Sequence, residues 1–293
     1  MSITIAHLGP QGTYAEVATL AVAQWLERQG QGTPTLCPYR SIAQTLYAVE
    51  QGETALAVVP IENSTEGSVR ATLDTLWQLG DIQIQQAWTL PITHALISHD
   101  PSLEAIATVY SHPQALAQCH DWMQVNIPQA KRMPTSSTAN ALEQLATGKA
   151  AGAIASRRAA ELYGLPVVAY PINDQPDNCT RFWVLSQTDF VYPDQAPDHQ
   201  TQFTHTSMAF SLPKNVPGAL LQVLKIFAER DLNLARIESR PTKRVLGEYL
   251  FFIDVERGPQ DPAMQTALNA LERCTEMLKV FGQYRVLQVE DKP

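Results

Sequence analysis

The sequence has little of what a metal centre, a disulfide framework or a membrane anchor needs. Only four of its 293 residues are cysteine, and none shows the CxxC or Cys/His spacing typical of metal sites. No run approaches the ~20 consecutive apolar residues of a transmembrane helix. The N-terminus also lacks the basic and apolar regions of a signal peptide. We therefore expect a cytoplasmic protein with no bound metal.

Basic charge is scarce too. The chain carries 21 Lys and Arg residues against 29 Asp and Glu residues, which gives a net charge of −8. This balance argues against nucleic acid or an anionic membrane as the main partner. Hydrophobic residues make up 45% of the chain and charged residues 17%, so a sizeable core is expected. The length allows two domains of ordinary size.

A nucleotide-binding fingerprint is missing as well. Residues 3–8 predict a strand, and residues 9–12 predict a tight turn before a helix that extends to about residue 28. The turn, GPQG, lacks the third glycine of GxGxxG and the GKS or GKT ending of a phosphate-binding loop. Gly12 and Thr13 therefore fit either a purely structural turn or a segment whose backbone lines the site of another kind of ligand.

The most informative stretch that is present is TALAVVPIENSTEGS, residues 54–68. Its apolar, β-branched start predicts a buried strand that ends at Pro60, because proline cannot donate to a sheet ladder. Seven residues without an apolar side chain follow, from Glu62 to Ser68, before helical spacing begins at Val69. Open α/β sheets place ligands in such loops. Capping by Ser68 alone would leave the other polar residues unexplained, so we predict a ligand site.

Strands and helices alternate along the following residues. Residues 82–98 predict two strands, or one strand broken at Pro91. Residues 109–114 end a strand in a polar loop, residues 135–138 precede a helix, and residues 151–155 predict another strand. This alternation, with polar loops at successive strand ends, predicts a doubly wound α/β domain.

Thr180 and Arg181 stand at the start of a strand predicted at residues 182–185. The planar guanidinium group of arginine is suited to binding carboxylates. On the residues alone, Arg181 fits either a ligand contact or a surface salt bridge, and Thr180 fits a β-branched strand position.

The pattern changes beyond a proline-containing linker at residues 191–202. Strands are predicted at residues 207–212, 233–241, 246–256 and 284–289, with helices after Pro217 and at residues 262–278. The order βαββαβ predicts a ferredoxin-like, split βαβ arrangement.

Several motifs now resemble those of the prephenate dehydratase family. They occur in the expected order over nearly the whole chain: GPQGTYAE, VVPIENSTEGSV, YSHPQALAQC, STANAL, NCTRFWVL, GALLQVL and IESRP. The resemblance implies conversion of prephenate to phenylpyruvate, with loss of carbon dioxide and water, in phenylalanine biosynthesis. This lyase reaction makes the ring aromatic and needs no cofactor.

The resemblance also implies a fold. Residues 1–190 would form a catalytic domain like a type 2 periplasmic-binding protein, with its active site between two α/β lobes. One lobe would comprise roughly residues 1–85 with 178–190, and the other residues 86–177. Residues 203–290 would form an ACT regulatory domain, the ferredoxin-like module predicted above.

The family motifs imply roles for individual residues. Thr180 would assist the leaving hydroxyl group, Arg181 would clamp a carboxylate, and Asn63 would complete the catalytic set. Glu62 would be either a protonated acid or an orienting group. Further substrate-binding groups would be Ser64, Ser111, Gln118, Ser137, Thr138 and Phe182. Some relatives carry an acidic residue where this chain has Ser136, so an acid at that position is not available.

The GAL and ESRP motifs imply an allosteric phenylalanine site in the ACT region. Its residues would be Gly218, Ala219, Leu220, Asn233, Glu238, Ser239, Arg240 and Pro241. On spacing alone, Gly218 could equally serve only to begin a helix, and residues 238–240 could form a solvated ion pair. ACT modules typically pair, so we expect a homodimer or homotetramer.

Two other functions stay open on the sequence. Arogenate dehydratase would perform the same chemistry on the transaminated substrate. A non-catalytic amino-acid sensor would combine a binding-protein fold with an ACT module, although the intact Thr180-Arg181-Phe182 motif counts against it.

Overall fold

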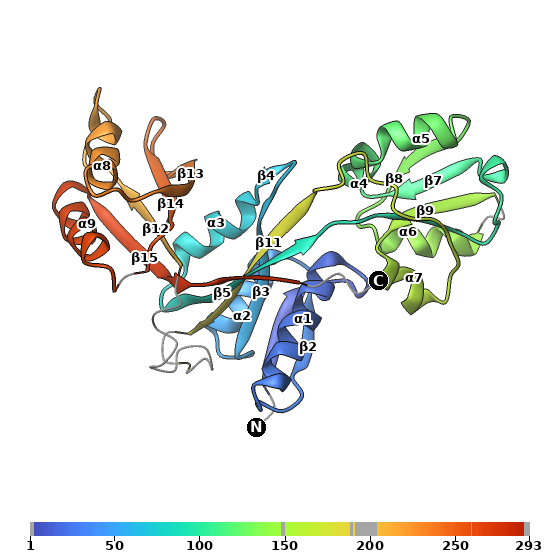
Figure 1. Cartoon of the computed structure of the whole chain (residues 1–293), viewed down its shortest axis with the longest axis horizontal. Coiled ribbons are helices and arrows are strands. Elements are labelled where there is room, and N and C mark those ends of the chain that lie inside the picture. The colour runs from blue at the N-terminus through green and yellow to red at the C-terminus, as the bar shows by residue number, and fades with distance from the viewer. Residues whose placement is uncertain (1–2, 148–149, 188–189, 191–203, 259, 290–293) are drawn as a thin grey trace.

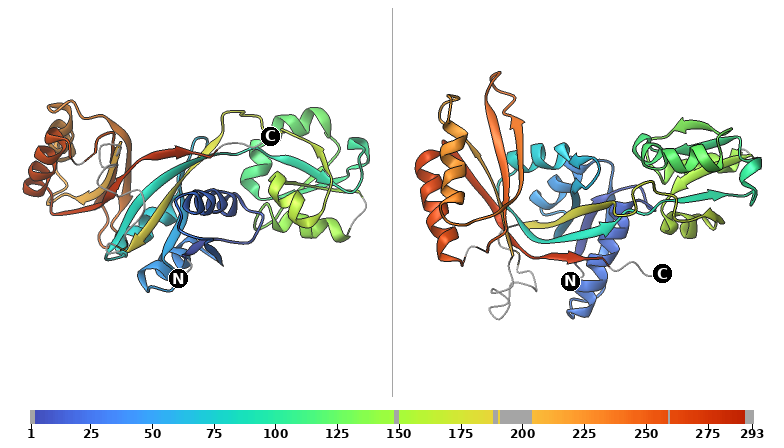
Figure 2. Two further views of the ribbon diagram at one scale, coloured as in Figure 1. Left: turned by 60° about the horizontal axis from the view of Figure 1, so that its bottom comes forward. Right: turned by 45° about the horizontal axis from the view of Figure 1, so that its top comes forward.

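Three sheets follow one another along an elongated molecule, with the C-terminal module at one end (Figures 1 and 2). The computed structural model describes residues 3–147, 150–187, 190, 204–258 and 260–289. The predicted linker, residues 191–202, lies outside these described residues. Two α/β lobes and a split βαβ module are all present, which confirms the predicted fold class.

The first sheet forms the centre of the molecule, in the order β16-β5-β11-β3-β1-β2, with the short β4 paired to β3. Its strands are β1 (Thr4–Leu8), β2 (Thr35–Tyr39), β3 (Leu56–Asn63), β4 (Gly67–Ser68), β5 (Ile82–Pro91), β11 (Cys179–Gln187) and β16 (Val286–Gln288). Helix α1 (Tyr14–Arg28) packs on one face, and α2 (Ile42–Glu50) and α3 (Arg70–Gln78) contribute to the core on the other.

Strand β3 runs through Pro60, so the predicted strand end there is wrong. Pro60 lies beside an irregularity in the register, where Phe182 pairs with Pro60 and Arg181 pairs with Glu62. A bulge tolerates a proline because the ladder is already interrupted there. Ser68 belongs to β4, and Val69 occupies the N-cap position of α3, which excludes the reading of Ser68 as a simple helix cap.

The second sheet has the order β10-β6-β9-β7-β8. It comprises β6 (Ala95–Ser98), β7 (Thr108–Ser111), β8 (Lys131–Pro134), β9 (Ala151–Ala155) and β10 (Val167–Ala169). Its helices are α4 (Pro113–Gln118), α5 (His120–Asn126), α6 (Asn140–Glu143) and α7 (Arg157–Tyr163), with 3-10 turns at Leu103–Ala105 and Gln144–Thr147. The chain enters this lobe after Pro91 and leaves it before Cys179, so residues 82–98 do form two strands, in different sheets.

The C-terminal module has the sheet order β13-β14-β12-β15. Its elements are β12 (His205–Ser211), α8 (Ala219–Ala228), β13 (Leu234–Pro241), β14 (Tyr249–Val255), α9 (Pro262–Cys274) and β15 (Met277–Tyr284). One face of the sheet packs against its helices. Residues of the other face, among them Phe252, Phe281 and Tyr284, share a core with α3 and the first sheet.

The end of the chain differs from the sequence prediction. The predicted helix at 262–278 ends at Cys274, and the module's fourth strand is β15 instead of a strand at 284–289. Strand β16 then pairs in parallel with β5 of the first sheet. Gly282 permits this course: it has φ +137°, and a Cβ atom there would lie 2.7 Å from the carbonyl oxygen of Ile84.

No helix among the described residues is long and apolar enough to cross a membrane. The same residues contain no cluster of three or more His, Cys, Asp or Glu side chains that could hold a metal ion.

We predict that the C-terminal module mediates self-association into a dimer or tetramer. Among the described strands, β13 has a partner on only one side, and Ile237 of β13 and Tyr249 of the neighbouring β14 are 47% and 44% exposed. Exposed apolar side chains beside an open strand edge favour pairing with a second copy. Light scattering at micromolar concentration should give at least twice the mass of one chain, and Ile237→Lys should reduce it. A wild-type monomer would contradict this prediction.

Candidate active site

A cleft of about 490 Å³ lies between the two lobes, where loops from both converge. The first lobe contributes the turn after β1 and the ends of β2, β3 and β11. The second lobe contributes the start of α4 and the loop before α6. Of the predicted site residues, Asn63, Gln118, Ser137, Thr138, Thr180 and Phe182 line this cleft.

Asn63 and Thr180 form a cross-strand pair at the ends of β3 and β11. The Asn63 amide nitrogen donates to the Thr180 hydroxyl oxygen at 2.9 Å and to the Asn178 side-chain oxygen at 2.9 Å. Its amide oxygen accepts from the Thr65 hydroxyl at 2.7 Å and from the Glu66 backbone N–H at 3.1 Å. Because Thr180 accepts from Asn63, its own hydroxyl proton is available to a group bound in the cleft.

A chain of hydrogen bonds crosses the cleft from one lobe to the other. The Tyr14 hydroxyl lies 2.8 Å from Nδ1 of His94, and Nε2 of His94 lies 2.9 Å from the side-chain oxygen of Gln118. The Gln118 amide nitrogen donates to the Thr65 hydroxyl at 3.1 Å, and Thr65 in turn donates to Asn63. Both ring nitrogens of His94 therefore have a hydrogen-bonding partner within the chain. Burial holds the pKa of His94 below its usual value, which favours the neutral ring.

Four predicted site residues do not line the cleft. The Ser111 side chain is fully buried and donates to the backbone oxygen of Ile154 at 2.6 Å. Ser64 bridges to the neighbouring strand, where its hydroxyl accepts from the backbone N–H of Cys179 at 3.0 Å. Glu62 and Arg181 form an ion pair at 3.7 Å and are absent from the cleft lining. The geometry therefore gives no support to a carboxylate clamp by Arg181 or to acid catalysis by Glu62.

Sequence reasoning missed several residues that do line the cleft: Tyr14, Arg40 and His94. Arg40 is the informative one, because its side chain is exposed and forms no ion pair among the described residues. It follows β2 and precedes α2, the same strand-to-helix position that pointed to Asn63, so this signal could have found it. His112 accepts a hydrogen bond from Gln114 N–H at the start of α4 and also lines the cleft.

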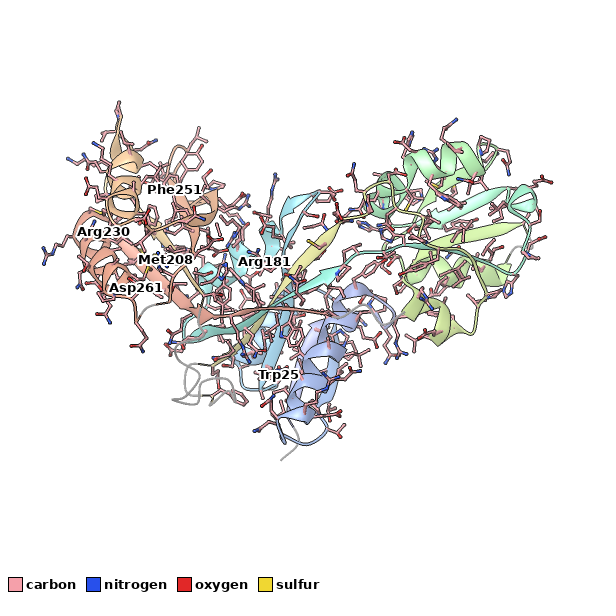
Figure 3. The ribbon with its side chains drawn as sticks, in the orientation of Figure 1. Trp25, Arg181, Met208, Arg230, Phe251 and Asp261 are labelled. Carbon is pink, nitrogen blue, oxygen red and sulfur yellow. The ribbon has the colours of Figure 1, made fainter. Side chains whose placement is uncertain are left out.

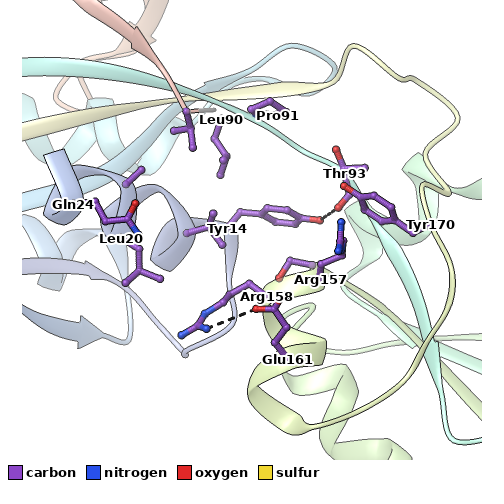
Figure 4. A pocket seen from close by; sticks show the side chains of 14 residues that line it. Tyr14, Leu20, Gln24, Leu90, Pro91, Thr93, Arg157, Arg158, Glu161 and Tyr170 are labelled. Carbon is purple, nitrogen blue, oxygen red and sulfur yellow. Dashed lines mark hydrogen bonds and ion pairs between the residues drawn. The ribbon is translucent and has the colours of Figure 1, made fainter. Parts of the chain in front are cut away.

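A second pocket, of about 480 Å³, opens between α1 and α7 (Figure 4). Tyr14 lines both pockets, and its hydroxyl donates to the Thr93 carbonyl oxygen at 2.9 Å. Arg157 lies over the Tyr170 ring at 5.0 Å, and Arg158 is 3.9 Å from Glu161. Neither Asn63 nor Thr180 reaches this pocket, so their hydrogen-bonded pair belongs to the first cleft alone.

The predicted effector residues lie at two places in the C-terminal module. Gly218 has φ +84° and occupies the N-cap position of α8, followed by Ala219 and Leu220. Glu238, Ser239, Arg240 and Pro241 lie on β13, and Asn233, just before it, donates to Glu256 at 2.6 Å. The Arg240 guanidinium pairs with Asp74 of α3 at 2.9 and 3.0 Å, so it faces the catalytic lobe.

The chain is similar to known proteins over nearly its full length. A prephenate dehydratase family profile matches residues 5–189, and an ACT domain profile matches residues 207–273. A bifunctional chorismate mutase/prephenate dehydratase of Neisseria gonorrhoeae is 40% identical over 96% of this chain and 74% of that protein. A prephenate dehydratase of Methanocaldococcus jannaschii is 38% identical over 98% of this chain and 99% of that protein.

Solved structures show the same likeness. A prephenate dehydratase of Arthrobacter aurescens in complex with L-Phe superposes with a TM-score of 0.84 at 35% identity, over 97% of this chain and 90% of that chain. A protein described as a novel type of quorum quenching acylase superposes with a TM-score of 0.80 at 28% identity, over 96% and 97% of the two chains.

We predict that His94→Gln reduces the loss of stability at acidic pH. The pKa of His94 is lowered in the folded protein, so the unfolded chain binds a proton first as the pH falls below about 6.5. Its contribution to stability is therefore complete above that pH and declines below it. Glutamine can donate and accept but cannot be protonated. The melting temperatures of the two proteins should converge as the pH falls from about 7 to 5, because only the wild type loses this contribution. Melting curves that stay parallel over this pH range would contradict the prediction.

Proposed function

We infer that this chain, which belongs to the prephenate dehydratase family, converts prephenate to phenylpyruvate, carbon dioxide and water. The observation that carries this inference is the hydrogen-bonded pair of Asn63 and Thr180 in a cleft between two lobes. The reaction is that of a hydro-lyase in phenylalanine biosynthesis, and we propose that it takes place in the cytoplasm.

The catalytic step is one of fragmentation and proton donation. The bond between the ring and its carboxylate breaks, and the electron pair enters the ring as carbon dioxide departs. The hydroxyl group on the opposite ring carbon leaves with its bonding electrons and takes up a proton to become water, and the ring becomes aromatic. We propose that the Thr180 hydroxyl donates to this leaving oxygen, while Asn63 fixes Thr180 and stabilises the charge that develops on it.

The two substrate carboxylates need different surroundings. The pyruvyl carboxylate survives the reaction, and Arg40 at the cleft edge is suited to bind it. The ring carboxylate is lost, and a cation beside it would stabilise the ground state more than the transition state. Neutral groups of Ser137, Thr138 and Gln118, with Phe182 against the ring, suit that part of the cleft.

We propose supporting roles for the predicted residues outside the cleft lining. Ser64 and Ser111 hold backbone segments beside the site by the hydrogen bonds described above. We propose a division into a catalytic domain (1–190), a linker (191–202) and a regulatory domain (203–290); the two matched profiles, over residues 5–189 and 207–273, fall within the first and last of these ranges.

Regulation by phenylalanine is part of the proposal. The relative from Arthrobacter aurescens was solved in complex with L-Phe, and this chain shares its ACT module. We propose that phenylalanine binds at the start of α8 together with β13, and that it favours a conformation with a less competent cleft.

A phenylpyruvate assay with purified protein tests the activity directly. Arogenate is tested in parallel, and faster turnover of arogenate would favour that substrate. Because one fold can host unrelated activities, acylase activity is measured as a third assay. Binding of prephenate without release of phenylpyruvate would favour a sensor.

Thr180→Ala should lower kcat by ~10²-fold or more, the scale typical of a positioned proton donor or hydrogen-bonding group. Thr180→Ser retains the hydroxyl group and should recover much of the loss. Circular dichroism and melting temperature check that both variants fold. Wild-type turnover in a folded Thr180→Ala protein would remove Thr180 from the mechanism.

Arg40→Gln should raise KM by ~10-fold or more with little change in kcat, because a charge-assisted contact of about 1.5–3 kcal/mol is lost in substrate and transition state alike. Arg158→Gln, in the second pocket, is the matched control and should leave KM near its wild-type value. An unchanged KM in Arg40→Gln would show that another group binds the pyruvyl carboxylate.

Gly218→Val should abolish inhibition by phenylalanine and leave uninhibited turnover within ~2-fold of wild type. Gly218 has a positive φ that a β-branched residue rarely adopts, and its Cα lies at the proposed effector site. Gly164→Val introduces the same strain at φ +62° in the second lobe and should retain inhibition. Full inhibition of Gly218→Val would place the effector elsewhere.

A further inference from the structure

Arg181 lies next to the catalytic threonine in sequence, but its side chain belongs to the other face of the sheet. In the antiparallel pairing of β3 and β11, Asn63 pairs with Thr180, and Glu62 pairs with Arg181. Successive strand residues point to opposite faces. Thr180 and Asn63 line the cleft, whereas Arg181 and Glu62 do not. Arg181, a residue of β11, lies near the middle of the molecule (Figure 3).

The face that carries Arg181 is covered by the C-terminal module. Trp183, two residues further along β11, contacts the Tyr284 ring of β15 with a centroid distance of 6.1 Å. Burial lowers the pKa of His205 in β12, and the charge of Arg181 lowers it further. Burial raises the pKa of Tyr284, and the charge of Arg181 is among the influences that oppose that rise. Arg181 and Trp183 lie on the same face of β11, which is the face that packs against β15.

A buried polar network in the module ends at this contact. The Tyr284 hydroxyl lies 2.8 Å from the Ser207 hydroxyl, and Ser207 donates to Asp254. Asp254 binds the Arg236 guanidinium through two hydrogen bonds, at 2.7 and 3.2 Å. That guanidinium lies over the Trp183 ring at 5.4 Å, so the network of β12, β13, β14 and β15 rests on β11. A shift of the module's sheet must move these groups against Arg181 and Trp183.

The contact is incompletely satisfied in this conformation. Nε of Arg181 and one terminal nitrogen of Arg236 are buried without a hydrogen-bond partner. The ion pair from Arg181 to Glu62 is 3.7 Å long, beyond the range of a charge-assisted hydrogen bond. The strand irregularity between Arg181 and Phe182 lies beside it. Buried donors without acceptors are costly, so a small displacement that satisfied them would be favourable.

We propose that Arg181, with Glu62, is a positioning residue that couples the C-terminal module to Thr180. In this arrangement the pair of Arg181 and Glu62 lies on the module's side of the same two strands whose other side carries Asn63 and Thr180. Tightening or releasing that pair changes the local path of β11 at the bulge and therefore the placement of the Thr180 hydroxyl. Arg181 does not bind substrate.

This proposal rests on the proposed function and gives Arg181 a behaviour different from that of a substrate clamp. A clamp acts on substrate binding and should be indifferent to phenylalanine. A positioning residue acts on kcat, because Thr180 matters in the transition state, and its loss weakens the response to phenylalanine. The two roles therefore predict opposite patterns in kcat, KM and inhibition.

The test compares Arg181→Gln, Glu62→Gln and the double variant of the full-length protein, with Arg40→Gln as the cleft control. We expect both single variants to lower kcat by ~5-fold or more and to leave KM within ~2-fold. The inhibition ratio at saturating phenylalanine should fall towards 1, while calorimetry still detects phenylalanine binding. The double variant should be no worse than the poorer single variant, as expected for two residues of one pair. Arg181→Lys retains the charge and should recover part of the inhibition if Arg181→Gln folds poorly.

Hydrogen exchange separates this proposal from the proposed function, because it needs no turnover. Phenylalanine should change amide exchange in residues 180–186 of wild type, and Arg181→Gln should lose that change. A raised KM with unchanged kcat in Arg181→Gln would overturn the proposal in favour of a clamp. Full phenylalanine inhibition in both single variants, or the same exchange response in Arg181→Gln as in wild type, would overturn the coupling. Absence of phenylpyruvate formation by wild type would instead contradict the proposed function.

Discussion

The side-chain amide of Asn63 is the interaction on which the site depends. It is 6% exposed and has partners at both of its polar atoms. Through its nitrogen it fastens the start of β11, which lies more than a hundred residues away along the chain. Through its oxygen it shapes the loop at Thr65 and Glu66. An aspartate could accept but not donate, and the buried Thr180 hydroxyl would lose its donor. The pairing of β3 with the start of β11 and the shape of the loop after β3 therefore both depend on one neutral amide.

The sequence was sufficient for the fold class and for the loops that form the cleft, because alternating strands and helices end in polar turns. It was not sufficient for the direction of individual side chains. Arg181 stood in a family motif beside Thr180, but only the pairing with Glu62 and the module beyond it show which face it occupies. Ser111 likewise had a residue type and position suited to substrate binding, yet its hydroxyl donates to the backbone oxygen of Ile154.

Tertiary contacts also decided the elements that were mispredicted. Residues after Cys274 could continue a helix on local preference, but they form β15 because β12 offers an open edge. Tyr14 and His94 were missed because their role arises from a chain of hydrogen bonds between lobes, which leaves no local pattern. Arg40 was different: its place after a strand was visible, but a single arginine in a turn has little specificity until the cleft is seen.

The parallel pairing of β16 with β5 attaches the C-terminal end of the regulatory module to the catalytic sheet. A module whose exit strand is part of another sheet can reorient only as far as that strand pairing allows. The same pairing makes β16 the outermost strand, so β5 is not an edge. A truncated chain that ended after residue 190 would leave the outer edge of β5 without a partner and open to aggregation. The C-terminal segment therefore both carries the regulatory module and covers the outer edge of the catalytic sheet. Deleting it removes regulation and exposes that edge at the same time.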